Sequence, residues 1–296
     1  MAVSPGTEVS PGGVVAVLQV TSTADKEHNW AQCSALVRRA AARGARAVFL
    51  PEGFDFIGDS PQQSLALAEP LHGDLVGRYR QLARECDVWL SLGGFHERGE
   101  DWDSTGRIYN CHLLLDNSGS LVAQYRKLHL FDAALPGAPA LQESAFTSPG
   151  RGLAPPVDTP VGKVGLAVCY DLRFPELAQA QREAGAQILT FPSAFTVPTG
   201  AAHWEVLLRA RAIECQCYVV AAAQTGRHHA GRASFGHSLV ADPWGTVVAQ
   251  CQEGPGLCLA HIDLGYLEQV RRALPVHGHR RRDLFGPPGQ PGTRPG

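Results

Sequence analysis

The sequence predicts an α/β protein of two similar halves, in which a pair of β-sheets is covered by helices on its outer sides. Two observations carry this prediction. Short apolar runs alternate with segments whose apolar residues recur at helical spacing, which indicates a layered α/β fold. In addition, two expected hairpins match almost residue for residue, D-N-S-G-S-L-V-A-Q at 116–124 and D-P-W-G-T-V-V-A-Q at 242–250.

The first half is expected to run strand, helix, strand, helix, strand and then hairpin. Residues 14–20 form a continuously apolar run, which is typical of a strand buried on both faces. A helix over about 25–43 follows, with Trp30, Cys33 and Val37 on one side. The remaining elements are a strand over 47–50, a helix marked by Leu71, Leu75, Tyr79, Leu82 and Cys86, a strand over 88–95, and hairpin strands over 108–115 and 120–126.

The second half repeats this order. Trp204, Leu208 and Ala212 recur at helical spacing and give its longer helix an apolar stripe. The expected elements are strands over 163–170, 187–192 and 218–223, helices over about 174–184 and 201–215, and hairpin strands over 239–241 and 246–250. No linker separates the two halves, so we expect one domain over 14–285.

Three segments rich in Pro, Gly and Ser lie outside these elements. Residues 1–13 are expected to be a flexible N-terminus, and residues 286–296 a disordered tail. Residues 133–160 are expected to form a long loop, and loops of that length are usually functional or disordered.

Composition narrows the class of protein. The 296 residues are 44% hydrophobic and 18% charged, the balance of a folded globular protein. The formal net charge of −2 favours neither nucleic acid nor membrane as a partner, and no apolar run is long enough to span a bilayer. The N-terminus lacks the apolar stretch of a secretory signal, so we expect a cytoplasmic protein; a mitochondrial form would need a longer isoform. The eight scattered cysteines are expected to be reduced, and no metal or organic cofactor is expected.

Cys169 is the candidate nucleophile. It follows the apolar run 164–168 and precedes a predicted helix, so its sulfur can be exposed at the edge of a sheet. Backbone N–H groups at a helix start stabilise both a thiolate and a developing oxyanion. A buried structural cysteine is the alternative interpretation when this residue is considered alone.

Three charged residues are candidate partners for this cysteine. Glu52 follows Leu50-Pro51 at the end of another buried strand, where we expect burial to raise its pKa and make it a suitable proton acceptor. Lys127 ends the second strand of the first hairpin and can stabilise an oxyanion, and Glu143 in the long loop can hold that lysine in place. Each residue alone also fits a solvated position.

Together these segments resemble a known family. L-P-E at 50–52, Y-R-K-L-H-L-F-D at 125–132, E-S at 143–144 and C-Y-D-L-R-F-P-E at 169–176 occur in the order seen in the amidase branch of the nitrilase superfamily. H-W-E-V-L-L-R-A-R-A-I-E at 203–214 is also similar. The resemblance implies a four-layer α-β-β-α sandwich and at least a homodimer. It also implies roles for Glu52 as general base, Lys127 as oxyanion stabiliser and Cys169 as nucleophile, with a thioester intermediate. Glu143 matches a second glutamate that supports the lysine and the substrate amide.

The same resemblance suggests a substrate class. L-S-L-G-G-F-H-E-R-G at 90–99 and A-A-A-Q-T-G-R-H-H at 221–229 are similar to amidases that act on deaminated glutathione, releasing 2-oxoglutarate and cysteinylglycine. Hydrolysis of 2-oxoglutaramate, the ω-amidase reaction, is the alternative of the same chemistry. An interaction protein with an incidental amidase site is the alternative of another class.

Four residues are expected to contact the substrate. Arg173, four residues after the nucleophile, can bind a substrate carboxylate through two parallel hydrogen bonds, or can instead pair with Glu176 or Asp171. The backbone N–H of Tyr170 is expected to assist the oxyanion, and Phe195 and Thr199 are expected to line the mouth of the pocket.

Overall fold

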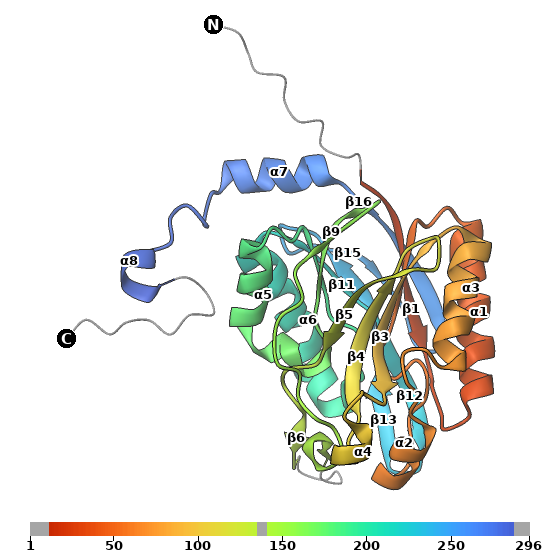
Figure 1. Ribbon diagram of the computed structural model, residues 1–296. Coiled ribbons are helices and arrows are strands. Elements are labelled where there is room, and N and C mark those ends of the chain that lie inside the picture. Colours follow the sequence, from red (N-terminus) through yellow and green to blue (C-terminus); the bar gives the residue numbers. More distant parts are fainter. Residues whose placement is uncertain (1–11, 135–140, 287–296) are drawn as a thin grey trace, which may run out of the picture.

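Two β-sheets pack against each other, and helices cover their outer faces (Figure 1). The computed structural model describes residues 12–134 and 141–286. Side chains alternate along strand β1 (Gly13–Val20): Val15 and Val17 belong to the core between the sheets, whereas Ala16 and Leu18 face the helices. This alternation gives four layers, so the predicted α-β-β-α sandwich is confirmed.

The first sheet has eight strands in the order β13-β12-β1-β2-β3-β4-β5, with β16 paired to β1. β1 is parallel to β2 and β12 and antiparallel to β16. The other members are β2 (Ala47–Leu50), β3 (Trp89–Glu97), β4 (Tyr109–Leu115), β5 (Leu121–Arg126), β12 (Ala223–His229), β13 (Arg232–Phe235) and β16 (Gly256–Ile262).

The second sheet has six strands in the order β15-β14-β11-β10-β9-β8. Its central strands β9, β10 and β11 are parallel. The members are β8 (Val157–Thr159), β9 (Gly162–Leu166), β10 (Ile188–Thr190), β11 (Tyr218–Ala221), β14 (Leu239–Ala241) and β15 (Val247–Gln250).

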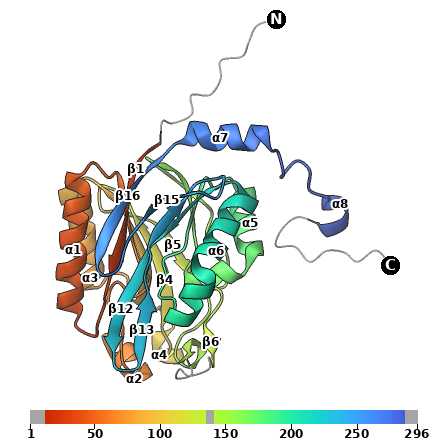
Figure 2. The ribbon, with the colours of Figure 1, turned by 180° about the vertical axis from the view of Figure 1, so that it is seen from behind.

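Four helices form the outer layers. α1 (Lys26–Ala42) and α3 (Asp74–Cys86) cover the first sheet, and α5 (Pro175–Glu183) and α6 (Val197–Cys215) cover the second, as the two opposite views show (Figure 1, Figure 2). Trp204 and Leu208 anchor α6 in the core. The remaining elements are helices α2 (Pro61–Leu67), α4 (Trp102–Thr105), α7 (Leu264–Ala273) and α8 (Arg282–Phe285), the 3-10 turns η1 (Glu143–Ala145) and η2 (Cys169–Arg173), and strands β6 (Asp132–Ala133) and β7 (Leu141–Gln142). Within the described residues, none of the helices is long and apolar enough to cross a membrane.

The two halves are related by pseudo-symmetry, as predicted. The strand order β5-β4-β3-β2-β1 of the first sheet corresponds to β15-β14-β11-β10-β9 of the second, and each series is flanked by an antiparallel strand, β16 or β8. The halves are nevertheless interleaved, because β12, β13 and β16 come from the second half of the chain and pair in the first sheet.

Several predicted boundaries are wrong. The strand expected over 163–170 ends at Leu166, because the chain turns at Cys169 into η2. The helix expected over 201–215 begins at Val197, and the loop expected over 133–160 contains the short elements β7, η1 and β8. Gly13, assigned to the N-terminal segment, already belongs to β1. Apart from residues 12, 13 and 286, the two predicted terminal segments lie outside the described residues.

Candidate active site

Cys169 lies at a sharp turn between β9 and α5. Its φ of +45° is in the left-handed region, which non-glycine residues rarely adopt and which costs of order 1–3 kcal/mol. The Cys169 N–H donates to the carbonyl of Pro192 at 2.9 Å, so the turn is tied to the neighbouring strand end. The backbone is thus held in a strained conformation that directs the sulfur into the site.

A buried carboxylate, Asp171, braces this turn. Its Oδ2 accepts from the N–H of Val168 at 2.9 Å and from the hydroxyl of Tyr125 at 2.7 Å. Its Oδ1 accepts from the N–H and the Nδ1 of His129 at 3.1 and 2.7 Å. His129 therefore has a structural role, and Asp171 links the nucleophile turn to the segment that follows Lys127.

Glu52, Lys127 and Glu143 form one buried cluster. The Nζ of Lys127 donates to Glu52 Oε1 at 2.9 Å and to Glu143 Oε2 at 2.8 Å. Lys127 is only 2% exposed, so its ammonium depends on these two carboxylates for compensation. The amide of Asn110 on β4 donates to both carboxylates, at 2.8 Å to Glu52 and at 2.9 Å to Glu143.

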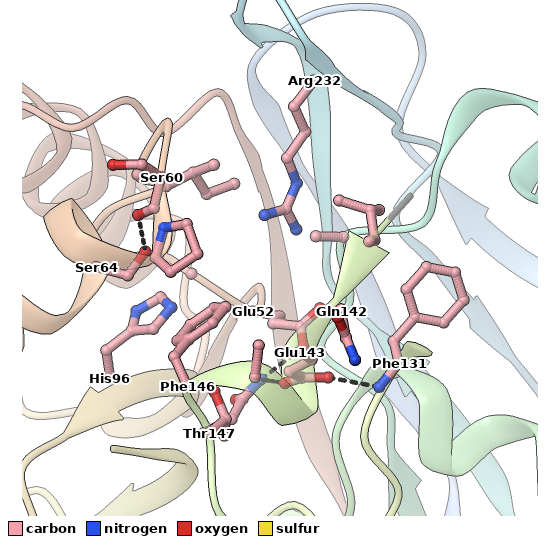
Figure 3. A pocket seen from close by; sticks show the side chains of 18 of the residues that line it. Glu52, Ser60, Ser64, His96, Phe131, Gln142, Glu143, Phe146, Thr147 and Arg232 are labelled. Atoms are coloured by element: carbon pink, nitrogen blue, oxygen red, sulfur yellow. Dashed lines mark hydrogen bonds between the residues drawn. The ribbon is translucent and has the colours of Figure 1, made fainter. Parts of the chain in front are cut away.

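These residues reach the site from separate elements. Glu52 follows β2 and Cys169 follows β9, so both come from carboxyl ends of parallel strands. Lys127 directly follows β5, and Glu143 begins η1. The N–H of Phe131 donates to Glu143 Oε2 at 2.8 Å and fixes that side chain (Figure 3). The structure therefore brings together the four predicted catalytic residues.

The charges in the cluster can be assigned from their surroundings. Burial alone would raise the pKa of Glu52, but Lys127 and the Cys169 thiol outweigh it and hold that pKa below its ordinary value. Burial likewise opposes the ammonium of Lys127, yet the carboxylates of Glu143 and Glu52 hold its pKa well above its ordinary value. The expectation of a raised Glu52 pKa is therefore wrong, because it considered burial without the lysine.

The surroundings of Cys169, the candidate nucleophile, favour the neutral thiol over the thiolate. Burial and the neighbouring Glu52 carboxylate together raise the pKa of Cys169 far above its ordinary value. The site thus holds a carboxylate, an ammonium and a protonated thiol. This combination can move a proton from sulfur to Glu52 as the sulfur attacks an electrophilic carbon.

A pocket of about 620 Å3 opens over these groups. Cys169, Glu52 and Lys127 line its inner part, and Phe131, Phe146 and Ile57 supply apolar walls. Further along are Ser60, which caps the N-terminus of α2, Ser64 on α2, and Arg232 on β13 (Figure 3). Within the described residues, no cluster of three or more His, Cys, Asp or Glu side chains is suited to hold a metal ion.

Comparison with known proteins identifies the family. A model described as carbon-nitrogen hydrolase matches residues 14–272. The chain belongs to the carbon-nitrogen hydrolase family. The predicted membership of the nitrilase superfamily is thereby confirmed, and with it the hydrolysis of carbon–nitrogen amide bonds as the activity of this chain.

Three members of this carbon-nitrogen hydrolase family are especially informative. The chain is 65% identical over 278 residues to the human protein named deaminated glutathione amidase, covering 94% of this chain and 85% of that one. The crystal structure of the Caenorhabditis elegans NitFhit protein matches with a TM-score of 0.88 at 50% identity, over 94% of this chain and 67% of that chain. Saccharomyces cerevisiae Nit3 matches with a TM-score of 0.82 at 32% identity, over 94% of this chain and all of that one.

None of the four residues predicted to contact the substrate lines this pocket. The guanidinium of Arg173 lies over the ring of Phe195 at 5.5 Å and contacts Nδ1 of His203 at 3.2 Å, rather than pairing with Glu176 or Asp171. Phe195 packs against Trp204 in the core. The Thr199 hydroxyl bonds to that of Thr196.

Tyr170 differs from Arg173, Phe195 and Thr199 in lying next to both the pocket wall and Cys169. Its ring packs edge-on against Phe131, which itself lines the pocket. Its backbone N–H lies at the start of η2, where the first internal hydrogen bond runs from Asp171 N to the Val168 carbonyl. The Tyr170 N–H is next to Cys169 in the chain and does not take part in that hydrogen bond. It is therefore placed to donate to an oxyanion formed at Cys169.

Sequence reasoning missed Asn110, Asp171 and Arg232. Asn110 is an amide within an otherwise apolar strand, and such a buried polar residue is a signal for a functional contact. Asp171 was considered only as an ion-pair partner. No pattern in the sequence connects Arg232 with Cys169, since only the folded hairpin brings it to the pocket.

Proposed function

We propose that this protein hydrolyses the amide of deaminated glutathione that joins the 2-oxoglutarate unit to cysteinylglycine. The observation that carries the proposal is the cluster in which Lys127 donates to Glu52 and Glu143 in the same pocket that Cys169 lines. The identity of 65% to the human deaminated glutathione amidase supports this substrate.

Cys169, Glu52 and Lys127 have separate roles in acylation. Glu52 accepts the thiol proton as the sulfur of Cys169 bonds to the amide carbon. Lys127 has three N–H donors, of which two are committed to carboxylates, so the third is available to the oxyanion. The Tyr170 N–H is the second donor, and one such donor is typically worth ~3 kcal/mol of barrier. Protonated Glu52 then gives its proton to the departing nitrogen, leaving a thioester on Cys169.

Deacylation returns the site to its starting state. Glu52, again a carboxylate, accepts a proton from water as the water attacks the thioester carbon. The carbon–sulfur bond breaks, the sulfur recovers the proton, and 2-oxoglutarate leaves. Glu143 and Asn110 contribute by fixing Lys127 and Glu52, with no proton transfer of their own.

The size of the pocket favours a peptide-like substrate. Cavities of roughly 300–1,000 Å3 enclose ligands of drug size, and the volume of about 620 Å3 lies within that range. A short monoamide such as 2-oxoglutaramate would leave much of this space to water. The pocket also extends beyond the nucleophile to α2 and Arg232, as a substrate with a large leaving group requires.

Product analysis tests the proposal. The protein is incubated with deaminated glutathione and separately with 2-oxoglutaramate, and 2-oxoglutarate is quantified from each. We expect a higher kcat/KM for deaminated glutathione. A preference for 2-oxoglutaramate would instead assign the ω-amidase reaction. Turnover of neither, with Cys169 still open to alkylation, would favour an interaction role.

We also propose that the protein is a homo-oligomer assembled through α6. Val206 and Ile213, two helical turns apart, are 67% and 51% exposed. Trp244, in the adjoining turn, is 58% exposed, and Arg209 Nε ties that turn to α6 through the Gly245 carbonyl at 2.8 Å. A contiguous exposed apolar patch of this kind is typical of an interface.

Light scattering measures this assembly. Ile213→Glu should reduce the molar mass to that of the monomer at a concentration where the unmodified protein is oligomeric. Val122→Glu, at a 39% exposed site on β5, is the matched control and should leave the assembly intact. An oligomer that survives Ile213→Glu would exclude this interface.

A further inference from the structure

Arg232 is a cation at the pocket wall that has no anionic partner among the described residues. It lies at the start of β13 and lines the pocket, and its guanidinium points into the cavity (Figure 3). Within residues 12–134 and 141–286, its side chain takes part in no hydrogen bond and no salt bridge. A half-buried guanidinium in a cavity favours an anionic ligand, above all a carboxylate.

The other charged groups of the pocket are already engaged or lie at its rim. Lys127 is neutralised by Glu52 and Glu143. His96 is held by Asp55, whose carboxylate contacts Nδ1 at 2.9 Å. Asp59 is exposed and lies more than 4 Å from Arg232, since the two form no salt bridge. Among the described residues, Arg232 is thus the lysine or arginine of the pocket that remains available to a substrate.

Strand register gives the position of Arg232 relative to the nucleophile. At the start of β12, the amide of Gln224 donates to the Glu52 and Gly53 carbonyls at 3.1 Å. β12 then continues past the carboxyl end of β1 to His229, which is paired with Arg232. At ~3.3 Å per residue, this places the Arg232 backbone roughly 15 Å beyond the Glu52 segment. The long side chain of Arg232 points back toward Glu52 and so shortens the distance between its guanidinium and the Glu52 segment (Figure 3).

This separation matches the leaving group rather than the acyl group. Two extended residues span at most roughly 7 Å, which is the reach of cysteinylglycine from the scissile nitrogen to its terminal carboxylate. The keto-acid carboxylate of the acyl group is closer to the attacked carbon and would not extend to the β12–β13 hairpin. The terminal carboxylate of the leaving peptide would extend to this hairpin.

The hairpin that carries Arg232 is firmly held. His228 is buried, with Nδ1 bonded to the Ser22 carbonyl and Nε2 to the Ser234 hydroxyl, both at 2.8 Å. Burial, together with the nearby Arg232 charge, lowers the pKa of His228 to about 4, so it is neutral and adds no second cation at neutral pH. A rigid support lowers the entropy cost of fixing a guanidinium on a ligand.

We propose that Arg232 binds the C-terminal carboxylate of the leaving peptide and so selects amides whose amine portion is an anionic dipeptide. This assignment rests on the proposed function and identifies the part of the substrate that distinguishes deaminated glutathione from 2-oxoglutaramate, whose leaving group is ammonia. Arg232 acts on substrate selection, while the chemical step stays with Cys169 and Glu52.

A substrate-and-variant cycle tests the assignment. Deaminated glutathione is compared with its C-terminal carboxamide in the unmodified protein, in Arg232→Met and in Arg232→Lys. The unmodified protein should prefer the acid by roughly 10- to 100-fold in kcat/KM, mainly through KM. Arg232→Met should remove the preference by weakening only the acid, and Arg232→Lys should retain part of it. Arg227→Met is the matched control, since Arg227 is an exposed arginine of the same hairpin that does not line the pocket.

The outcomes separate the two proposals. An unchanged preference for the acid in Arg232→Met, with the thermal midpoint of the unmodified protein, would overturn the role of Arg232 and leave the amidase function standing. Equal turnover of acid and carboxamide by the unmodified protein would overturn it as well. Turnover of neither substrate by an unmodified protein whose Cys169 is still alkylated would overturn the proposed function, and the Arg232 assignment with it.

Discussion

Replacing Asp171 by Asn should weaken both the fold and the nucleophile turn. Each carboxylate oxygen accepts one backbone N–H, from Val168 or from His129. Backbone N–H groups only donate, so whichever way the Asn amide is oriented, its NH2 group faces one of them. One buried donor is then left without an acceptor, and the remaining hydrogen bonds lose the assistance of the negative charge.

The expected cost follows from these contacts. A hydrogen bond to a charged group contributes about 1.5–3 kcal/mol; one backbone hydrogen bond is lost on the side of the NH2 group, and the three other hydrogen bonds to this side chain no longer involve a charge. We therefore expect the free energy of unfolding to fall by about 3–5 kcal/mol. The turn at Cys169, already strained at a φ of +45°, should relax, and a displacement of the sulfur by ~1 Å can reduce kcat about 100-fold.

Urea unfolding followed by tryptophan fluorescence, at fixed protein concentration, measures the first effect, and steady-state hydrolysis measures the second. Asp116→Asn is the matched control. Asp116 also accepts a backbone N–H, from Ser120 at 2.8 Å, but it is only half-buried, in the β4–β5 turn, and its replacement should cost at most about 1 kcal/mol. The bracing role of Asp171 is refuted if Asp171→Asn changes stability no more than Asp116→Asn and retains full kcat.

Three further predictions concern charge and protonation. Glu143→Gln leaves Lys127 with one carboxylate, so kcat/KM should fall roughly 10- to 100-fold in steady-state assays; full activity would exclude a supporting role. Glu52→Gln should abolish turnover yet speed alkylation of Cys169 by iodoacetamide at pH 8, because the Glu52 charge raises the thiol pKa; slower alkylation would contradict that cause. Burial lowers the pKa of His112 to about 4, so the unfolded chain binds a proton near pH 6.5 that the folded chain does not, and stability should fall by roughly 3 kcal/mol between pH 7 and pH 4. In His112→Gln, the urea midpoint of unfolding should fall less between pH 7 and pH 4 than in the unmodified protein. The same fall in both proteins would refute the role of His112.

The sequence predicted the elements whose signal is local. The strand over 47–50 has the expected bounds, because a buried strand closed by proline is recognisable without its neighbours. The four catalytic candidates were also found, since each lies at the end of a predicted element or in the long loop after one. The structure adds that Lys127 joins the two glutamates directly.

What the sequence did not predict depends on contacts between distant segments. β12 and β16 pair in the first sheet with β1, more than 200 residues away, and no local periodicity encodes such a pairing. The direction of the Glu52 pKa shift depends on Lys127, 75 residues further along the chain. Arg173 and Arg232 are both arginines near chemistry-bearing segments, and only the folded turn and hairpin determine which of them faces the pocket.

The most direct test of the mechanism is to trap the acyl-enzyme. The protein is mixed with excess deaminated glutathione, quenched with acid within one turnover, and digested, and the peptide containing Cys169 is analysed by mass spectrometry. We predict a 2-oxoglutaryl group in thioester linkage to Cys169, absent from Cys169→Ala. Release of 2-oxoglutarate by Cys169→Ala, or an acyl group on another residue, would contradict the account.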